Sequence, residues 1–202
     1  MKNVIRNTKK GILMVTMMAT LASFANDKAS FFSIVNGAER TSVTLVNVNE
    51  GDLLSIKDEN GMILYKEAIQ TTGVFTKGFD LTSLPNGAYL FELNKDVEIS
   101  TIPFTVKASE VSFKKELEKT FFKPVTRVKG DLVFVTKLSL EKAPMDIEVY
   151  SGTDGNYELM YSETIKNTEN IERLFKLTGI NKVDYKLVYK TEGRVFTKII
   201  RS

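Results

Sequence analysis

Short runs of alternating apolar and polar residues, separated by turn-forming residues, recur along most of the chain. Leu54 and Ile56 belong to one such run, and Met62 and Leu64 belong to the next, which follows an Asn-Gly pair. An Asn-Gly pair between two alternating runs is the strongest short-range signal of a β-hairpin. Later runs of the same kind are Ala88–Leu93, Val97–Ile99, Asp146–Tyr150, Tyr157–Ile165, Tyr185–Tyr189 and Val195–Ile200. Short strands at this spacing predict antiparallel β-sandwiches, an all-β fold of the Ig-like type.

The pattern occurs twice, which indicates a duplicated module. Shifted by 96 positions, residues 65–106 align with residues 161–202 without a gap, and 9 of the 42 positions are identical. Upstream the offset becomes 93, and the difference falls in the predicted hairpin turn, where insertions are tolerated. The identical pairs include Tyr65 with Tyr161, Glu67 with Glu163, Ile69 with Ile165, Phe79 with Phe175, Leu81 with Leu177, and Tyr89 with Tyr185. The pairs at offset 93 are Val35 with Val128, Gly37 with Gly130, Leu45 with Leu138, and Leu54 with Ile147. Matching aromatic positions argue against a chance alignment of unrelated β segments.

Each module has a small predicted core in which aromatic residues supply much of the buried area. Tyr89 and Tyr185 each follow a turn, which favours packing in the core or at a corner over a carbohydrate-stacking surface. The predicted core residues are Phe79, Leu81, Leu84, Tyr89 and Phe91 in the first module, and Phe175, Leu177, Ile180, Tyr185 and Leu187 in the second.

The first 25 residues have the order of a secretory signal peptide. Four basic residues precede an apolar run at Gly11–Leu21, and Ser23 and Ala25 are small residues at the −3 and −1 positions of a cleavage site after Ala25. The apolar run is short for a membrane-spanning helix, which needs about 20 residues. The alternative is an N-terminal anchor that is never cleaved. The pattern predicts a secreted, periplasmic or cell-surface protein.

These patterns divide the chain into four predicted parts. They are a signal peptide at 1–25, a first β-sandwich module at 26–106, a linker at 107–123 and a second β-sandwich module at 124–202. The linker pattern leaves its structure open: Phe113, Leu117 and Phe121 recur every four residues, as on a helix, while Val111 and Phe113 alternate, as on an edge strand.

Composition excludes several classes of function. The chain has no Cys and no His, which excludes disulfide scaffolds, thiol nucleophiles, zinc sites with Cys ligands and an imidazole general base. The predicted signal peptide carries four of the 28 basic residues and none of the 25 acidic ones, so 24 basic and 25 acidic residues remain, a net charge of −1. The remaining chain has no basic stripe, and we expect no nucleic-acid partner. No later run is long enough for a transmembrane span.

The acidic turns are the first candidates for chemistry. Asp58, Glu59 and Asn60, with Asp52 nearby, carry the oxygen ligands that calcium prefers, but the regular spacing of a calcium loop is missing. Asp and Asn in turns usually bond their own backbone. Asp154 before Gly155 is interpreted in the same way. We therefore predict no metal site and no cofactor.

Paired carboxylates are the second candidates, because two acidic side chains can hydrolyse a glycosidic bond. Asp96 and Glu98 share a strand face beside a predicted turn, where charge is usually solvated. Glu67 and Glu163 occupy matching repeat positions, which indicates outward-facing positions retained from a common ancestor. We therefore predict no catalytic residue, and a carboxylate hydrolase stays the weaker alternative.

Both modules resemble the β-sandwich modules of secreted bacterial proteins that include the Por (type nine) secretion-system C-terminal sorting domain. The motif in the first module is Asp58-Glu59-Asn60-Gly61, Phe79-Asp80-Leu81, and Leu84-Pro85-Asn86-Gly87-Ala88-Tyr89, and the end of the chain, Tyr185-Lys186-Leu187 and Gly193–Arg201, is similar to the family's final segment. The resemblance covers about residues 50–106 and 145–202. In the second module Val183 and Asp184 replace the Gly87-Ala88 pair. The resemblance implies the fold and an envelope or secreted location, and it implies no catalytic residue.

The sequence therefore predicts a non-catalytic exported protein that acts as a structural or binding module for a protein or glycan at the cell envelope. The alternative is that the second module serves as a secretion signal. Binding requires an exposed apolar surface, which we expect around Phe121 and Phe122.

Overall fold

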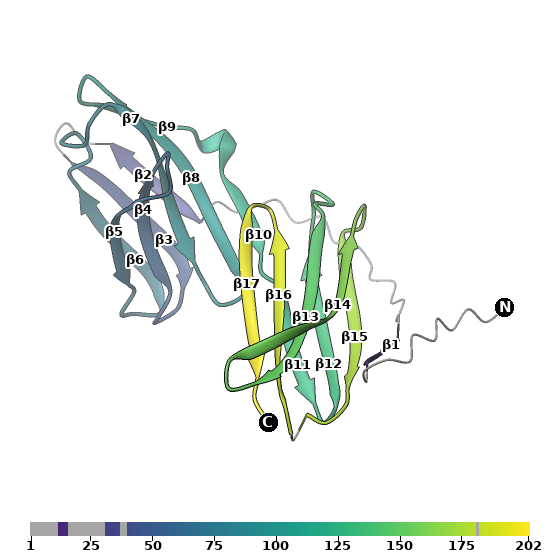
Figure 1. The fold of residues 1–202 in the computed structure, drawn as a ribbon. Helices are drawn as coiled ribbons and strands as arrows, with labels where there is room; N and C mark the ends of the chain where they lie inside the picture. Colours follow the sequence, from purple (N-terminus) through teal and green to yellow (C-terminus); the bar gives the residue numbers. More distant parts are fainter. Residues whose placement is uncertain (1–11, 16–30, 37–39, 181) are drawn as a thin grey trace. The chain divides into compact units, whose positions relative to one another are not determined.

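The computed structural model describes residues 12–15, 31–36, 40–180 and 182–202 (Figure 1). In these ranges the regular structure is β, apart from one 3₁₀ turn, η1, at Lys115–Leu117. The chain divides into two compact units, residues 23–121 and residues 122–202 together with the N-terminal residues 1–22. We call them the first and the second module and describe each by itself.

The first module is a sandwich of two antiparallel sheets. The smaller sheet has the order β2 (Phe32–Asn36), β3 (Thr41–Val48), β6 (Gly73–Phe79). The larger has the order β10 (Lys119–Phe122), β8 (Glu98–Lys107), β7 (Gly87–Asn94), β4 (Leu53–Asp58), β5 (Ile63–Ala68), with β9 (Glu110–Phe113) also paired to β8. Counting from β2 to β8, strands one, two and five face strands three, four, six and seven. This is an Ig-like arrangement.

The second module repeats that strand order. When β1 is left out of the count, the larger of its two sheets has the order β14 (Asn156–Ile165), β13 (Met145–Thr153), β16 (Asp184–Thr191), β17 (Arg194–Ile200). Its other sheet has the order β1 (Ile12–Val15), β15 (Asn170–Leu177), β12 (Leu132–Leu138), β11 (Val125–Lys129). Without β1, the two sheets contain the same seven strands in the same order as the first module. The prediction of two all-β, Ig-like sandwich modules is confirmed.

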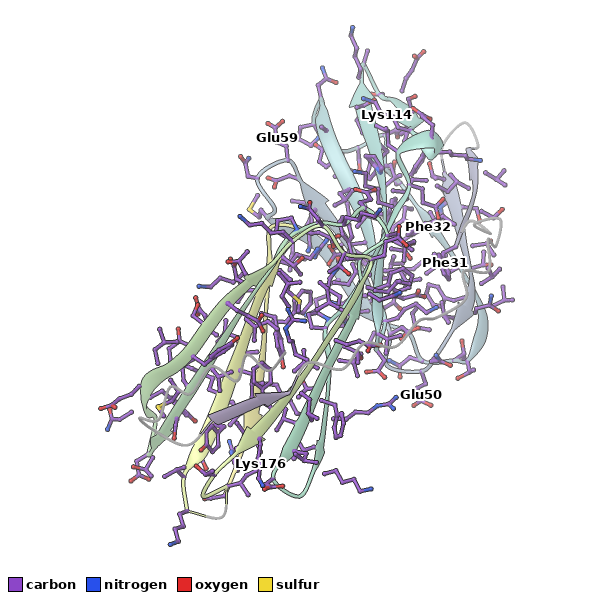
Figure 2. The ribbon with its side chains drawn as sticks, turned by 90° about the vertical axis from the view of Figure 1, so that its right-hand side faces the viewer. Phe31, Phe32, Glu50, Glu59, Lys114 and Lys176 are labelled. Atoms are coloured by element: carbon purple, nitrogen blue, oxygen red, sulfur yellow. The ribbon has the colours of Figure 1, made fainter. Side chains whose placement is uncertain are left out.

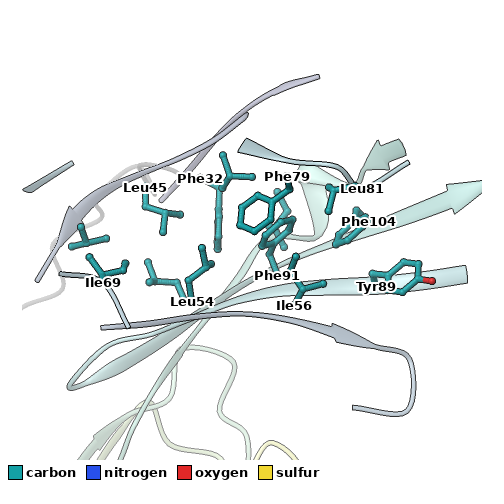
Figure 3. Packing of buried hydrophobic residues seen from close by; sticks show 14 of the residues in the cluster. Phe32, Leu45, Leu54, Ile56, Ile69, Phe79, Leu81, Tyr89, Phe91 and Phe104 are labelled. Carbon is teal, nitrogen blue, oxygen red and sulfur yellow. The ribbon is translucent and has the colours of Figure 1, made fainter. Parts of the chain in front are cut away.

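Side chains from both sheets interdigitate to form the core of the first module (Figure 3). Phe91 is fully buried and lies edge-on to Phe79, with ring centroids 5.3 Å apart. Phe104 packs against Phe91 on one side and stacks on Tyr89 on the other. Such ring pairs add about 0.5–1.5 kcal/mol each beyond the area they bury. Aromatic contacts therefore supply much of the stability of a core this small.

The predicted core residues lie where the sequence pattern placed them. Eight of the ten are buried, and the remaining two, Leu84 and Ile180, are partly buried and pack against the cores of their modules. The Tyr89 hydroxyl donates to the Pro85 carbonyl at 2.7 Å, and the Tyr185 hydroxyl donates to the Thr178 carbonyl at 2.6 Å. Each is a tyrosine corner, a bond from the sixth strand back to the preceding loop. The prediction of core or corner packing for both tyrosines is confirmed.

The strand registers show which residues of the two modules occupy equivalent positions. Leu54 pairs with Glu67 in the first module, and Ile147 pairs with Glu163 in the second, as the offsets of 93 and 96 require. A β-bulge follows Ile56 in one hairpin and Val149 in the other, again at matching positions. The hairpin of the second module is longer, and the three extra residues lie there.

The predicted pairing of Leu45 with Leu138 is wrong by one residue. Val43 pairs with Lys77, and Val135 pairs with Arg173, so the offset between β3 and β12 is 92. Leu45 is fully buried and therefore matches Lys137, whereas Leu138 is exposed. Because side chains alternate along a strand, a shift of one residue moves each side chain to the opposite face. The same shift separates Val35 from Val128, and Gly37 lies outside the described residues.

The segment expected as a linker, 107–123, is folded onto the first module. Its residues form β9, η1 and β10, and both strands pair with β8. The alternation of Val111 and Phe113 thus describes the segment better than the helical spacing does: Val111 pairs with Val106, and Phe113 with Phe104. The expected signal peptide lies mostly outside the described residues. Its described part, Ile12–Val15, is β1.

Candidate functional site

In the acidic turn at the tip of the β4–β5 hairpin, the Asp58 carboxylate hydrogen-bonds the backbone of its own turn. Asp58 Oδ1 accepts hydrogen bonds from the backbone N–H groups of Asn60 and Met62, at 3.0 and 2.8 Å. Glu59 lies at the exposed tip (Figure 2). The buried Asp52 caps a different turn through the N–H of Asn49. Within the described ranges, no three acidic side chains gather in a way that could hold a metal ion.

The matching glutamates Glu67 and Glu163 each join the two sheets of their module. Glu67 on β5 bonds Lys77 on β6 at 2.6 Å and accepts the Tyr65 hydroxyl. Glu163 on β14 receives the Arg173 guanidinium on β15 at 2.9 and 3.0 Å. These residues are not simply outward-facing: they form an ion pair between the sheets at the same place in each repeat.

Electrostatics favour the ionised form of Glu67. Lys77 and then Tyr65, by hydrogen bonding, lower the pKa of Glu67. Burial, followed by the neighbouring carboxylate, raises the pKa of Tyr65 and of Tyr161. The rings also pack on the core: Tyr65 meets Phe79 edge-on at 5.2 Å, and Tyr161 meets Phe175 at 5.7 Å. The ionised Glu67 carboxylate, paired with Lys77, joins the two sheets of the first module.

Asp96 and Glu98 do not form a carboxylate pair that faces a shared cleft. Glu98 is paired with Lys95 at 2.9 Å, and both side chains are largely buried. Asp96 is exposed in the turn between β7 and β8. Asp154, with Gly155, likewise occupies a turn and has a positive φ of 53°.

Exposed apolar side chains gather on the outer face of the larger sheet of the second module. We call this the β13–β16 face. Val149 and Leu187 point into the core, so their neighbours in sequence, Tyr150 and Lys186, point outward. Cross-strand pairs share a face, which extends the surface to the edge strands β14 and β17. Three of its aliphatic side chains are exposed, namely Leu159 (55%), Val195 (65%) and Ile199 (43%).

One row of this face crosses all four strands in register. Leu159 pairs with Tyr150, Tyr150 with Lys186, and Lys186 with Ile199. Strands lie about 4.8 Å apart, so the row spans about 14 Å. An exposed aliphatic residue therefore stands at each end of a row that has a tyrosine and a lysine in the middle.

Lys186 is held between two tyrosine rings. Its Nζ lies 4.6 Å from the centroid of the Tyr150 ring and 4.6 Å from that of the Tyr157 ring. Cations within about 6 Å of an aromatic face are attracted to it. The two contacts restrict the rotamers that these rings and the lysine can adopt together.

A carboxylate fixes the other end of Tyr150. The Tyr150 hydroxyl donates to Glu148 at 2.7 Å, and Lys190 Nζ donates to the same carboxylate at 2.6 Å. The bond from Lys190, with that from Tyr150, lowers the pKa of Glu148, and the Glu148 carboxylate raises the pKa of Tyr150 and of Lys190. The outer face is thus a pre-ordered aromatic and cationic surface at neutral pH.

The expectation of an exposed apolar surface at Phe121 and Phe122 is wrong, because both side chains are half-buried. The first module also exposes Met62, Ile63 and Leu64, where Met62 precedes β5 and a bulge at the start of β5 interrupts the alternation of side chains. The sequence signal that was missed is the alternation within Tyr157–Ile165 and Val195–Ile200. Their outward positions carry Leu159, Val195 and Ile199 where a solvated face would be polar.

Across the described residues, no helix is long and apolar enough to cross a bilayer.

No family profile and no curated protein matches the chain. Among solved structures, the chain is similar to the interferon gamma receptor alpha chain of chicken, analysed in selenomethionine-substituted form. The identity is 9%, the match covers 85% of this chain and 97% of the receptor chain, and the TM-score is 0.26. The Ig-like assignment here rests on strand order, registers and the tyrosine corners. Nothing in these comparisons shows similarity to the Por sorting domain.

Proposed function

We propose that the chain is a non-catalytic exported protein whose second module binds a partner protein at the cell envelope. The observation that carries the proposal is the row Leu159–Tyr150–Lys186–Ile199 on the β13–β16 face. Exposed aliphatic residues around ordered tyrosines are typical of the centre of a protein interface, where aromatic side chains supply most of the binding energy. Export is supported by the basic, apolar and small-residue order of residues 1–25.

A protein partner fits this face better than a glycan. Glycans stack on free aromatic faces, and here the ammonium of Lys186 already lies against the faces of Tyr150 and Tyr157. Leu159 and Ile199 add exposed apolar area at the two ends of the row. A partner that presents an apolar patch would bury these two side chains and gain about 25 cal/mol for each Å² of apolar area removed from water.

Site-specific photo-crosslinking in the native host tests the proposal. A photoreactive residue replaces Leu159 or Ile199 in separate variants, and Leu138, exposed on the other sheet of the same module, is the matched control position. We expect the same protein adduct at both face positions and none at Leu138. Adducts at all three positions, or at none, would contradict binding through this face.

The sorting role remains the alternative that the sequence resemblance implies. Fusing residues 124–202 to a reporter that carries its own signal peptide distinguishes the two functions. A binding module leaves the reporter in the periplasm, whereas a sorting module delivers it to the cell surface or the medium.

A further inference from the structure

The smaller sheet of the second module has an added strand from the N-terminus of the chain. β1 pairs antiparallel with β15, with Ile12 opposite Leu177, Leu13 opposite Lys176, and Val15 opposite Leu174. Figure 2 shows Lys176 on the strand beside β1. The sequence of β1 is Ile-Leu-Met-Val, four apolar residues in a row.

The sandwich itself does not require this strand. The matching strand in the first module, β6, pairs with β3 and ends the described part of its sheet. β15 pairs with β12 along its whole length and supplies Phe175 and Leu177 to the core. β1 therefore occupies an edge that the fold completes without it.

Removal of β1 would leave the edge of β15 unpaired. Ile12–Val15 lies inside the predicted signal peptide, and cleavage after Ala25 would take it away. Every second residue of an edge strand directs its N–H and C=O outward, which makes such an edge a template for another strand. An edge strand can bind an extended peptide through these main-chain groups.

We propose that the β15 edge is a strand-acceptor site, closed in the precursor by Ile12–Val15 and open in the mature protein to an extended apolar segment of another protein. β1 indicates what kind of strand this edge accepts, because it is a short apolar run that pairs with β15 and belongs to neither set of seven sandwich strands. A second copy of the chain would pair through its own β15, which carries the charged residues Glu172, Arg173 and Lys176, whereas β1 is entirely apolar. This site differs from the β13–β16 face, so either proposal can fail without the other.

Hydrogen exchange on the full chain tests the first half of the proposal. The variant Leu13→Pro/Met14→Pro removes two adjacent N–H groups, and one of the two faces β15 because these groups alternate along a strand. We expect the β1-facing amides of β15 to exchange about tenfold faster or more in this variant. Amides of the central strand β16 are the internal control and should be unchanged, because the substitutions lie outside the sandwich.

A peptide tests the second half. The probe is residues 11–16, Gly-Ile-Leu-Met-Val-Thr, with a two-lysine tail for solubility, and its control has proline at the positions of Leu13 and Met14. Added to the proline variant, the probe should restore slow exchange on β15, and the control peptide should not. The unaltered full chain, whose edge is closed, should bind the probe at least about tenfold more weakly.

Three results would overturn the inference. Equal exchange of β15 in the full chain and the proline variant would show that β1 does not close this edge. Failure of the probe to protect the variant would show that the edge takes no apolar strand. Concentration-dependent dimerisation of the variant in sedimentation, with protection of β15 and no peptide binding, would assign the edge to a second copy.

Discussion

Lys137 occupies a core position that the first module fills with leucine. It points inward from β12 opposite Ile171, at the position that matches the fully buried Leu45. Its side chain is 1% exposed, and its nearest carboxylate is Glu192 Oε1 at 3.8 Å. The perturbation we consider is the double substitution Lys137→Leu/Glu192→Gln, which replaces the ion pair without leaving a charge unpaired.

The contacts of Lys137 are few for a buried charge. Its three N–H donors make one hydrogen bond, to the Leu138 carbonyl at 3.3 Å. The ion pair at 3.8 Å is longer than a charge-assisted hydrogen bond, which measures about 2.7–2.9 Å. Replacing a poorly paired buried ion by an apolar side chain of similar volume stabilises proteins by about 1–4 kcal/mol. We expect a gain of about 1–3 kcal/mol in the free energy of unfolding of the second module.

Urea unfolding, followed by circular dichroism and by hydrogen exchange of the strands of the second module, measures this gain. Each single variant completes a double-mutant cycle. Lys137→Leu alone should gain less than the double variant, because it leaves Glu192 without its partner. Lys176→Leu is the matched control: Lys176 and Asp131 are about half exposed, and such pairs contribute about 0–1 kcal/mol.

The dependence on pH gives an independent check. Burial lowers the pKa of Lys137 in the folded chain, while the unfolded value stays near 10.5. Between the lowered pKa and 10.5 the unfolded state binds more protons, so the free energy of unfolding rises with pH across that window. The double variant should lose this rise. A destabilised double variant, or a pH slope equal to that of the unaltered chain, would refute the reasoning.

Three further predictions rest on individual contacts, and a fourth rests on the sequence pattern of residues 1–25. Phe91→Ala and Phe175→Ala, at fully buried rings, should each cost about 3–5 kcal/mol in urea unfolding of their own module. Tyr89→Phe and Tyr185→Phe should each cost about 0.5–1.5 kcal/mol through loss of the corner hydrogen bond, whereas Tyr157→Phe, which keeps its ring beside Lys186, should cost less. Acid unfolding should show the ion pair of Glu67: its stabilisation is present above the unfolded pKa of 4.5 and is lost as pH falls through the lowered folded value, so Glu67→Gln should flatten this part of the acid titration. The intact mass of the protein recovered from fractionated cells of its native host should match residues 26–202, and a mass that includes residues 1–25 would contradict cleavage after Ala25.

Local chemistry made much of the fold predictable. The Asn60–Gly61 pair lies in the turn between β4 and β5, with Gly61 at a φ of 81°, which glycine adopts without strain. Tyr89 and Tyr185 follow turns, and both are tyrosine corners in the structure. Such features depend on a few neighbouring residues, so the sequence alone contains them.

Register between distant strands was harder to predict. The offset between the modules is 92 at Leu45 and 93 at Leu54, so the second module has one extra residue between these two strands. The bulge between Leu45 and Val48, with Asn47 at a φ of 55°, lies in the first module and does not supply that residue, so the local turn and bulge chemistry did not reveal the shift. With the register wrong by one residue, the sequence comparison assigned Leu138 to the core position that Lys137 occupies in the structure.

The repeat shows which positions kept the same chemistry in both modules and which did not. The ion pair between sheets is Glu67 with Lys77 in one and Glu163 with Arg173 in the other, so the residues that hold the sandwich together kept their chemistry.

The outward row did not keep its chemistry. In the first module it is Ile63–Lys57–Leu90–Pro103, where the second has Leu159–Tyr150–Lys186–Ile199. In the first module the lysine of this row pairs with a carboxylate, Glu92, at 2.9 Å, whereas in the second it lies between two tyrosine rings. The first module also continues its sheet beyond β8 with β9 and β10, while β17 ends the described sheet of the second module. Both rows sit on the same scaffold, so the fold does not require the tyrosines of the second row, and this difference supports the proposal that the second module binds a partner.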